Sequence, residues 1–468
     1  MRRATLRSLA ALPVALTGAA LAFPASAQNQ APESQTGLNL VQLCVVHRHG
    51  ARTPIGVHDK ENAATWLASE VEDKLKLDLA SMRVVRQHET SGKSEELAAK
   101  DVNNVDRAEH RAHGTLEGGA WPARLTFVGM KQAIDLGTRL RKEYLEGQGF
   151  LGGSWTTAKD HVYVRSTSTE RTIETAQGVL TGLFPGQIKK DSPATIYLRD
   201  TDEPEWGAPN FGNWCPRLKA LWKEGISTMN KEYTDEQKNL LEELKSKVSI
   251  DIPSEMGGFM LSVYRDEFWA RDAHGKALPQ GSDQVNNLLD RLQKSDADRI
   301  RAMFSGGSDS TRDEATRLHA GRMLVRIVKN LDKDPDDAHR LILYSGHDWT
   351  IMMLLMGLDP DGTDERTRNW PNFCSDLTFE RWQDGKTKQE YVRIIFEGEA
   401  LRLHHLEPHP EFPDLYTKES MHKALAPFLL AEHEIEEACK LPEKAQKPSN
   451  KSQEQPVKGS ASWSAFTN

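Results

Sequence analysis

Residues 39–55 read N-L-V-Q-L-C-V-V-H-R-H-G-A-R-T-P-I. The first half of this stretch, up to Val46, is short, apolar and rich in β-branched residues, which predicts a buried strand. Four basic or titratable side chains follow within six residues: His47, Arg48, His49 and Arg52. Cations this close together repel one another unless solvent or an anion offsets the repulsion. In a chain of net charge −8, they indicate either a solvated basic loop or a site for an anionic ligand.

The composition of the chain is that of a soluble globular protein. It has 468 residues, of which 38% are hydrophobic and 27% are charged, enough for a sizeable core. Its mild acidity argues against a nucleic-acid binder, because such proteins usually carry a basic surplus on one face.

The N-terminal segment is typical of a secretory signal peptide, which we predict at residues 1–27. Three arginines within the first seven residues precede the apolar run 9–23, and Ala25-Ser26-Ala27 forms a cleavage site. The apolar run is short for a membrane span and contains Pro13 and Gly18. We therefore expect an exported protein, secreted or in another exported compartment, without a stable membrane anchor.

Strands and helices alternate along the rest of the chain. Apolar β-branched runs predict buried strands at 39–46, 161–166 and 340–345, and residues 376–382 and 390–398 predict late antiparallel strands. Helical spacing is found at 125–144, 171–184, 312–331 and 349–358. This alternation predicts an α/β fold, a three-layer α/β/α core around a mostly parallel central sheet.

The remaining segments divide the chain further. We expect one domain at 28–440, with a long, mostly polar surface insertion at about 59–120 and a helical cap at about 200–300. Residues 441–468 are rich in Lys, Gln, Ser and Pro, which predicts a disordered polar tail.

The predicted fold brings charged residues together, because ligands of parallel sheets bind beyond the carboxyl ends of the strands. Each of the three strands ends in such residues, and a helix follows. The first ends in Arg48, His49 and Arg52, the second in Arg165, and the third in His347 and Asp348. Three arginines sharing one crevice with a single carboxylate favour a doubly charged anion such as phosphate.

This set of side chains could carry out phosphoryl transfer. A histidine among arginines has its pKa lowered, so a neutral imidazole can attack phosphorus and form a phosphohistidine. Asp348 could protonate the leaving alcohol and then accept a proton from water. The residues alone leave open whether His47 or His49 is the nucleophile. Simpler explanations exist for these residues. Asp348 could be only a helix N-cap, and Arg165 could be an ordinary surface residue. His47 and His49 could be a pair of metal ligands, which the neighbouring arginines disfavour.

Four segments, in this order, resemble motifs of the histidine acid phosphatases, branch 2 of the histidine phosphatase superfamily. They are R-H-G-A-R-T-P at 48–54, L-T-F-V-G-M-K-Q at 125–132, V-Y-V-R-S-T-S-T-E-R-T at 162–172 and Y-S-G-H-D at 344–348. The resemblance covers roughly residues 38–440. It implies an α/β core with a helical cap, and hydrolysis of phosphate monoesters with no metal or other cofactor.

The same resemblance implies roles for individual residues. His49 would be the nucleophile and Asp348 the proton donor, and phosphate would be bound by Arg48, Arg52, Arg165 and His347. It also implies a disulfide between Cys215, in the segment N-W-C-P at 213–216, and Cys439. Cys44 is expected to be a buried thiol, but whether Cys44 and Cys374 are free stays open.

The leading hypothesis is a secreted acid phosphatase of broad specificity, acting on small phosphate monoesters. A lysophosphatidic acid phosphatase is one alternative, since the long connection between the first two motifs is similar to that branch. Trp66, Trp121 and Trp206 could then line an apolar entrance, although packing in the core or the cap is the better explanation of these residues. A phytase is disfavoured by the mixed charge of the insertion, and an inactive phosphate-binding or host-interaction protein by the presence of His49 and Asp348. The choice between monomer and homodimer stays open.

Overall fold

The computed structural model describes residues 37–56, 63–88, 91–102, 114–200, 215–248, 257–334 and 339–442. The predicted signal peptide at 1–27, the tail from residue 443 onward and Trp206 lie outside the described residues.

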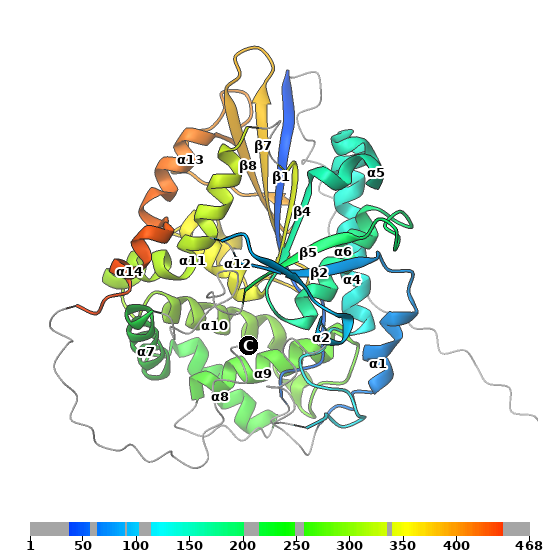
Figure 1. Ribbon diagram of the computed structural model, residues 1–468. Coiled ribbons are helices and arrows are strands. Elements are labelled where there is room, and N and C mark those ends of the chain that lie inside the picture. The colour runs from blue at the N-terminus through cyan, green and yellow to red at the C-terminus, as the bar shows by residue number, and fades with distance from the viewer. Residues whose placement is uncertain are drawn as a thin grey trace, which may run out of the picture.

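A single mixed sheet runs through the centre of the molecule (Figure 1). Within the described residues it has ten strands, in the order β10-β8-β7-β1-β6-β4-β5-β2-β3 with β9 paired to β8. The stretch β1-β6-β4-β5-β2 is parallel, and the strands on either side of it are antiparallel. The strand bounds are β1 Leu38–Arg48, β2 Met82–Gln87, β3 Ser94–Glu96, β4 Val162–Ser166, β5 Ala194–Arg199, β6 Leu341–Gly346, β7 Asp376–Asp384, β8 Glu390–Phe396, β9 Glu399–Ala400 and β10 Leu415–Thr417.

Helices cover both faces of the sheet, so the predicted three-layer α/β fold is confirmed. In Figure 1, α11, α12 and α13 lie on one side of the central strands, and α4, α5 and α6 lie on the other. The helices are α1 Ala68–Glu72, α2 Ala99–Val102, α4 Phe127–Leu140, α5 Trp155–Ala158, α6 Glu170–Leu183, α7 Pro216–Lys231, α8 Asp235–Lys247, α9 Gly257–Ala273, α10 Leu288–Phe304, α11 Asp309–Asp332, α12 Asp348–Leu358, α13 Lys418–Leu425 and α14 Ile435–Ala438.

The alternation of side chains along β1 explains why helices are needed on both faces. Leu43 and Val45 point into a core that includes residues of α4 and α6. Cys44 and Val46 point into the opposite core, which includes residues of α11 and α12. All four side chains are fully buried, and burying one such Val or Leu contributes roughly 1.5–3 kcal/mol. A strand buried on both faces therefore reads as a continuous apolar run.

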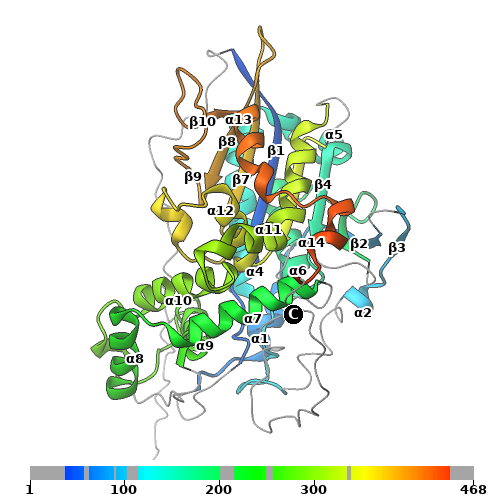
Figure 2. The same ribbon diagram turned by 90° about the vertical axis from the view of Figure 1, so that its left-hand side faces the viewer.

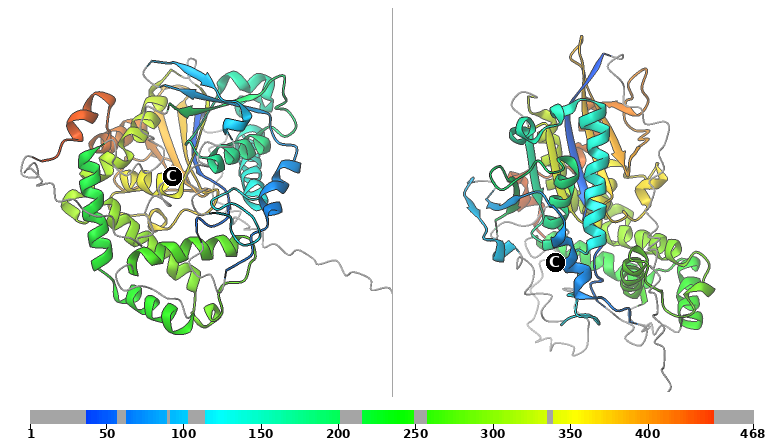
Figure 3. Two further views of the ribbon diagram at one scale, coloured as in Figure 1. Left: turned by 60° about the horizontal axis from the view of Figure 1, so that its bottom comes forward. Right: turned by 90° about the vertical axis from the view of Figure 1, so that its right-hand side faces the viewer.

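Four helices, α7 to α10, lie beyond one end of the sheet, and we refer to them as the cap (Figures 2 and 3). Three of them, α8, α9 and α10, share a core of their own, in which Leu240 and Leu244 of α8 pack with Phe268 of α9 and Leu292 of α10. The disulfide implied by the resemblance is present and joins Cys215, directly before α7, to Cys439, directly after α14. Cys44 and Cys374 are free, buried thiols.

The segment 59–120, expected as a surface insertion, contributes in part to the sheet. Met82–Gln87 forms β2, which pairs in parallel with β5 and extends the sheet beyond it. Val84 is the buried residue of this strand and the remainder is half-buried or exposed, so its sequence lacks the apolar run that marked the central strands. Trp66, from the same segment, is fully buried.

Candidate active site

The carboxyl ends of β1 and β6 bring the first and last motifs together. Arg48 pairs with Gly346 in the parallel register of these strands, so His49 and His347 follow them side by side. The ring centroids of these two histidines are 5.7 Å apart. Nη2 of Arg48 lies 2.9 Å from Oδ2 of Asp348, the first residue of α12. A cation, two imidazoles and a carboxylate thus meet at the strand ends.

The second motif holds the loop that follows β1. Thr126 caps α4 by accepting a hydrogen bond from the Gly129 amide, and its hydroxyl also donates to the Ala51 carbonyl at 3.1 Å. The Ala51 amide donates to the side-chain oxygen of Gln132 at 2.8 Å. A Cβ on Gly50 or Gly129 would collide with the backbone of the facing segment. The glycines therefore allow loop and helix to approach closely, and the Thr and Gln lock them in register.

His49 is buried and oriented for chemistry at one nitrogen. Its Nδ1 lies 2.9 Å from the carbonyl oxygen of Gly50, to which it donates in the neutral ring, so Nε2 keeps its lone pair. Burial lowers the pKa of His49 well below its ordinary value, and Arg171, Arg48 and Arg52 lower it further. A neutral imidazole surrounded by guanidinium groups is a nucleophile suited to an anionic centre.

His47 occupies a different position from His49. It is fully buried inside β1, beside Ser345 of β6 and Asp376 of β7. Its Nδ1 lies 3.4 Å from the Arg48 carbonyl, and burial lowers its pKa to about 4. The geometry therefore favours His49 as the reactive histidine, a choice that the residues alone had left open.

The third arginine near the two histidines is Arg171, in the first turn of α6. Its Nη2 lies 3.5 Å from Nδ1 of His347, and it is the arginine with the largest effect on the pKa of His49. Arg165, the arginine expected here, lies one residue before the end of β4, paired with Tyr344 of β6 and Tyr197 of β5. The structure therefore brings together all the predicted phosphate ligands except Arg165.

Thr167, between β4 and α6, contacts one of the site histidines. Its hydroxyl lies 3.0 Å from Nε2 of His347. Burial lowers the pKa of His347 to about 3, and Arg171 adds to the effect. His347 is therefore neutral, with both ring nitrogens facing polar groups of the β4–α6 segment.

Asp348 is the first residue of α12, and His347 before it is the N-cap. Its Oδ1 accepts from the Trp349 amide at 2.9 Å, and its Oδ2 accepts from the indole Nε1 of Trp370 at 3.2 Å. Burial alone would raise the pKa of this carboxyl, but Arg48, Arg265 and Arg52 outweigh burial and hold the pKa below its ordinary value. Without a bound anion, Asp348 is a carboxylate.

Two residues of cap helix α9 reach the site and carried no sequence signal. The carboxylate of Asp266 accepts from Nη2 of Arg52 at 2.7 Å and from the Ile55 amide at 3.1 Å. Burial acts to raise the pKa of Asp266, but Arg52 and Arg265 lower it to about 2. The guanidinium of Arg265 lies 3.6 Å above the ring of Trp370. Both residues belong to a helix far from the motifs in sequence, so only the fold could reveal them.

Residues 370–374 contact Arg48, His49 and Asp348. Nη1 of Arg48 donates to the Pro371 carbonyl at 2.7 Å, and the Arg48 guanidinium lies 4.3 Å from the ring centroid of Phe373. The Cys374 amide donates to the His49 carbonyl at 3.2 Å. This segment therefore fixes the position of the Arg48 guanidinium.

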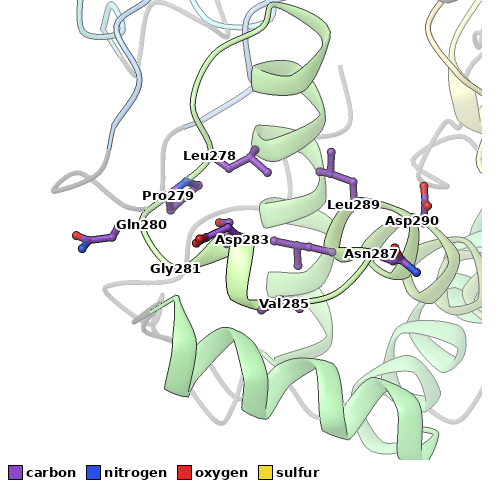
Figure 4. Close-up of a pocket in the computed structure, with 11 residues that line it drawn as sticks. Leu278, Pro279, Gln280, Gly281, Asp283, Val285, Asn287, Leu289 and Asp290 are labelled. Atoms are coloured by element: carbon purple, nitrogen blue, oxygen red, sulfur yellow. The ribbon is translucent and has the colours of Figure 1, made fainter.

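A separate cavity of about 610 Å³ lies in the cap (Figure 4). The charged residues of its lining are Asp283 and Asp290, so it is unsuited to a phosphate dianion. Among the described residues, no group of three or more His, Cys, Asp or Glu side chains is arranged to hold a metal ion. In the same part of the chain, every helix is too short or too polar to cross a lipid bilayer.

Comparison with known proteins places this geometry in a family. Residues 39–397 match the model of the histidine phosphatase superfamily (branch 2). Human lysophosphatidic acid phosphatase type 6 is 29% identical over 388 residues, which cover 81% of this chain and 82% of that protein. A probable acid phosphatase of Schizosaccharomyces pombe is 26% identical over 401 residues, 80% of this chain and 79% of that protein.

Among solved structures, the Hafnia alvei phytase in complex with tartrate superimposes with a TM-score of 0.53 at 16% identity, covering 87% of this chain and 99% of that chain. The Citrobacter braakii phytase gives a TM-score of 0.53 at 14% identity, covering 86% and 100%. These two structures bear on the fold alone. The chain belongs to branch 2 of the histidine phosphatase superfamily and is an enzyme that hydrolyses phosphate monoesters.

Proposed function

We propose that this enzyme is an exported acid phosphatase that works through a covalent phosphohistidine on His49. The observation that carries the proposal is the environment of His49, a buried imidazole with Nδ1 held by the Gly50 carbonyl and Arg48, Arg52 and Arg171 around it. His347 completes the phosphate site. Arg171 takes the place that we had expected for Arg165.

In the first step, the Nε2 lone pair of His49 attacks phosphorus and the bond from phosphorus to the ester oxygen breaks. The arginines neutralise the charge on the non-bridging oxygens, and their fixed positions reduce the reorganisation that the reaction needs. The leaving oxygen takes a proton from the carboxyl of Asp348. In the second step, water attacks phosphorus, the P–N bond breaks, and Asp348 accepts the proton of the water.

The acidic optimum follows from the charges around Asp348. The arginines that hold its pKa low in the free enzyme are neutralised when a phosphate dianion binds, so the pKa of the bound state is higher. Mild acid then protonates Asp348, whereas His49 stays neutral because its pKa is lowered by burial. Acid activity and a neutral nucleophile are therefore compatible.

Export is part of the proposal. It is supported by the signal-peptide pattern at residues 1–27 and by the disulfide between Cys215 and Cys439, since disulfides persist in oxidising compartments.

A lysophospholipid is a second candidate substrate class. Human lysophosphatidic acid phosphatase type 6 is a relative at 29% identity, and Trp121 is 39% exposed next to the site loop, where its carbonyl accepts from the Thr53 hydroxyl at 2.8 Å. An exposed indole next to the loop that follows β1 could contact an acyl chain. If so, Trp121→Ala raises KM for lysophosphatidic acid and leaves KM for glycerol 2-phosphate unchanged.

The proposal is tested with p-nitrophenyl phosphate at pH values from about 4 to 8, with and without EDTA, for wild type and His49→Ala. We expect activity in acid that EDTA does not affect, and a loss of roughly 10⁴-fold or more in the variant. Acid quenching with ³²P-labelled substrate should trap a phosphoenzyme in wild type alone. Activity that needs a metal, or that survives the loss of His49, would contradict this mechanism.

A further inference from the structure

Two tryptophans donate hydrogen bonds to the carboxylate of Asp348, the proposed proton donor, and they do so through different groups. The Trp349 contact uses a backbone amide, which any residue could supply at the start of α12. The Trp370 contact uses the indole Nε1, which is a donor only and belongs to a segment outside the four motifs. The Trp370 side chain is 3% exposed, so its N–H has little access to water as an alternative partner.

Arg265 fixes the position of that indole. Its guanidinium lies 3.6 Å from the Trp370 ring centroid, within the range of a cation–π contact. The guanidinium is itself anchored, because Nε of Arg265 donates to Oδ2 of Asp296 at 2.9 Å and Asp296 also accepts from the Ser262 hydroxyl. Asp296 is fully buried on α10, so two cap helices hold the cation over the ring.

We propose that Trp370 and Arg265 are positioning residues for Asp348, through which the cap fixes the geometry of proton transfer. This inference rests on the proposed function, since it assumes that Asp348 carries the proton. The indole N–H points at the carboxylate oxygen that also faces Arg48. With Trp349 on Oδ1, the carboxyl group has a defined plane.

The charges facing Asp348 indicate how its pKa changes when Trp370 or Arg265 is removed. Arg48 from β1, Arg52 from the following loop, Arg265 from α9 and the adjacent His347 all act on its pKa. Trp370 adds a neutral donor that also favours the carboxylate form. Loss of Trp370 or Arg265 therefore favours the protonated form, and it releases the carboxyl group from its fixed orientation.

The experiment compares two substrates that differ in their need for a proton. The p-nitrophenolate ion leaves without protonation, whereas the alkoxide of glycerol 2-phosphate does not. We expect Trp370→Phe and Arg265→Gln to lower kcat/KM for glycerol 2-phosphate roughly tenfold, and for p-nitrophenyl phosphate less than about threefold. The alkaline limb of the glycerol 2-phosphate profile should move to higher pH in both variants. Arg265→Lys, which keeps the charge without the planar stack, should show a smaller pH shift.

Trp382→Phe is the matched control. Trp382 is a buried tryptophan whose Nε1 donates to the carboxylate of Glu380 at 2.8 Å, far from the strand ends, with Arg393 5.9 Å from its ring centroid. This variant should affect both substrates equally. Asp348→Asn shows how far the losses of kcat/KM for the two substrates differ when the proton donor itself is removed.

The outcomes separate the inference from the proposed function. If Asp348→Asn discriminates between the substrates but the Trp370 and Arg265 variants do not, the inference is overturned and the proposed function stands. If Asp348→Asn does not discriminate, the proton-donor role fails, and the inference fails with it. If Trp370→Phe does not fold, the two Arg265 variants decide.

Discussion

Two carboxylates in this molecule, one fully buried and one half-buried, have similar partners and opposite surroundings. Glu380, inside β7, accepts from Nε and Nη2 of Arg393 at 2.7 and 3.0 Å, from the Tyr144 hydroxyl at 2.7 Å and from Trp382 at 2.8 Å. Asp348, at the strand ends, likewise meets an arginine and an indole N–H. Each is a carboxylate with a cation and a tryptophan, yet one belongs to the framework and the other to the active site.

The difference lies in how completely the cations are paired. The Glu380 side chain is fully buried, and Arg393 directs two donors at it. Around Asp348, the arginines exceed the carboxylates, and the Nε atoms of Arg48 and Arg52 are buried without a hydrogen-bond partner among the described residues. A paired charge holds strands together, whereas buried guanidinium donors without partners are suited to a ligand. The same amino-acid types thus serve two purposes according to the charge balance.

The largest expected contrast is in turnover. Changing a carboxylate to its isosteric amide should lower kcat/KM for glycerol 2-phosphate about 10²–10⁴-fold in Asp348→Asn. In Glu380→Gln the loss per folded molecule should stay below about threefold, because Glu380 touches no part of the site. Active-site titration with ³²P-labelled substrate corrects for the folded fraction. Equal losses in the two variants would remove the distinction between site and framework.

Stability should show the reverse order. Glu380→Gln leaves Arg393 buried with a weakened partner, and breaking a buried pair costs about 3–5 kcal/mol in the free energy of unfolding. Asp348→Asn should cost less, because its side chain is 15% exposed and water can reach it. Urea denaturation in phosphate-free buffer measures both. A loss in Asp348→Asn as large as that in Glu380→Gln would contradict the pairing argument.

The sequence predicted the central strands well, because β1 and β6 are buried on both faces and their apolar runs are unambiguous. It missed β5 and its neighbour β2, in each of which at least half of the side chains are half-buried or exposed. Burial of β2 depends on its neighbour β5, about a hundred residues away in the chain, and local composition carries no record of that pairing.

The sequence analysis selected Arg48, His49, His347 and Asp348 from their positions at strand ends, and the structure brings these four residues close together. Arg165 was chosen because it stands at a strand end, but the residue beside the histidines is Arg171, in the first turn of the next helix. The N-terminus of a helix after a parallel strand is a common place for an anion, and that rule could have directed attention to Arg171. Asp266 and Arg265 could not be found this way, because their position depends on how the cap packs.

Arg171 and Arg165 offer a sharper test of the difference between site and framework residues. Arg171→Gln should raise KM for p-nitrophenyl phosphate and the inhibition constant of inorganic phosphate by about 10- to 100-fold, since a charge-assisted contact of roughly 1.5–3 kcal/mol is lost. Arg165→Gln should leave both constants within about twofold of wild type and act on stability instead. Inhibition by phosphate at fixed pH measures the binding term alone. A larger effect in Arg165→Gln would restore the assignment made from sequence.

The smallest expected effect concerns acid stability, measured without phosphate. Burial lowers the pKa of His347 to about 3, below that of the unfolded chain near 6.5. Between about pH 6.5 and 3, His347 is protonated in the unfolded state but not in the folded state. It therefore contributes stability above about pH 6.5 that is lost as the pH falls toward 3. His347→Asn should reduce the slope of the unfolding free energy against pH by about 1.4 kcal/mol per unit between pH 6 and 4. An unaltered slope in His347→Asn would mean that this histidine accepts its proton in the folded enzyme, and the strand-end cluster would then be less cationic than its arginines indicate.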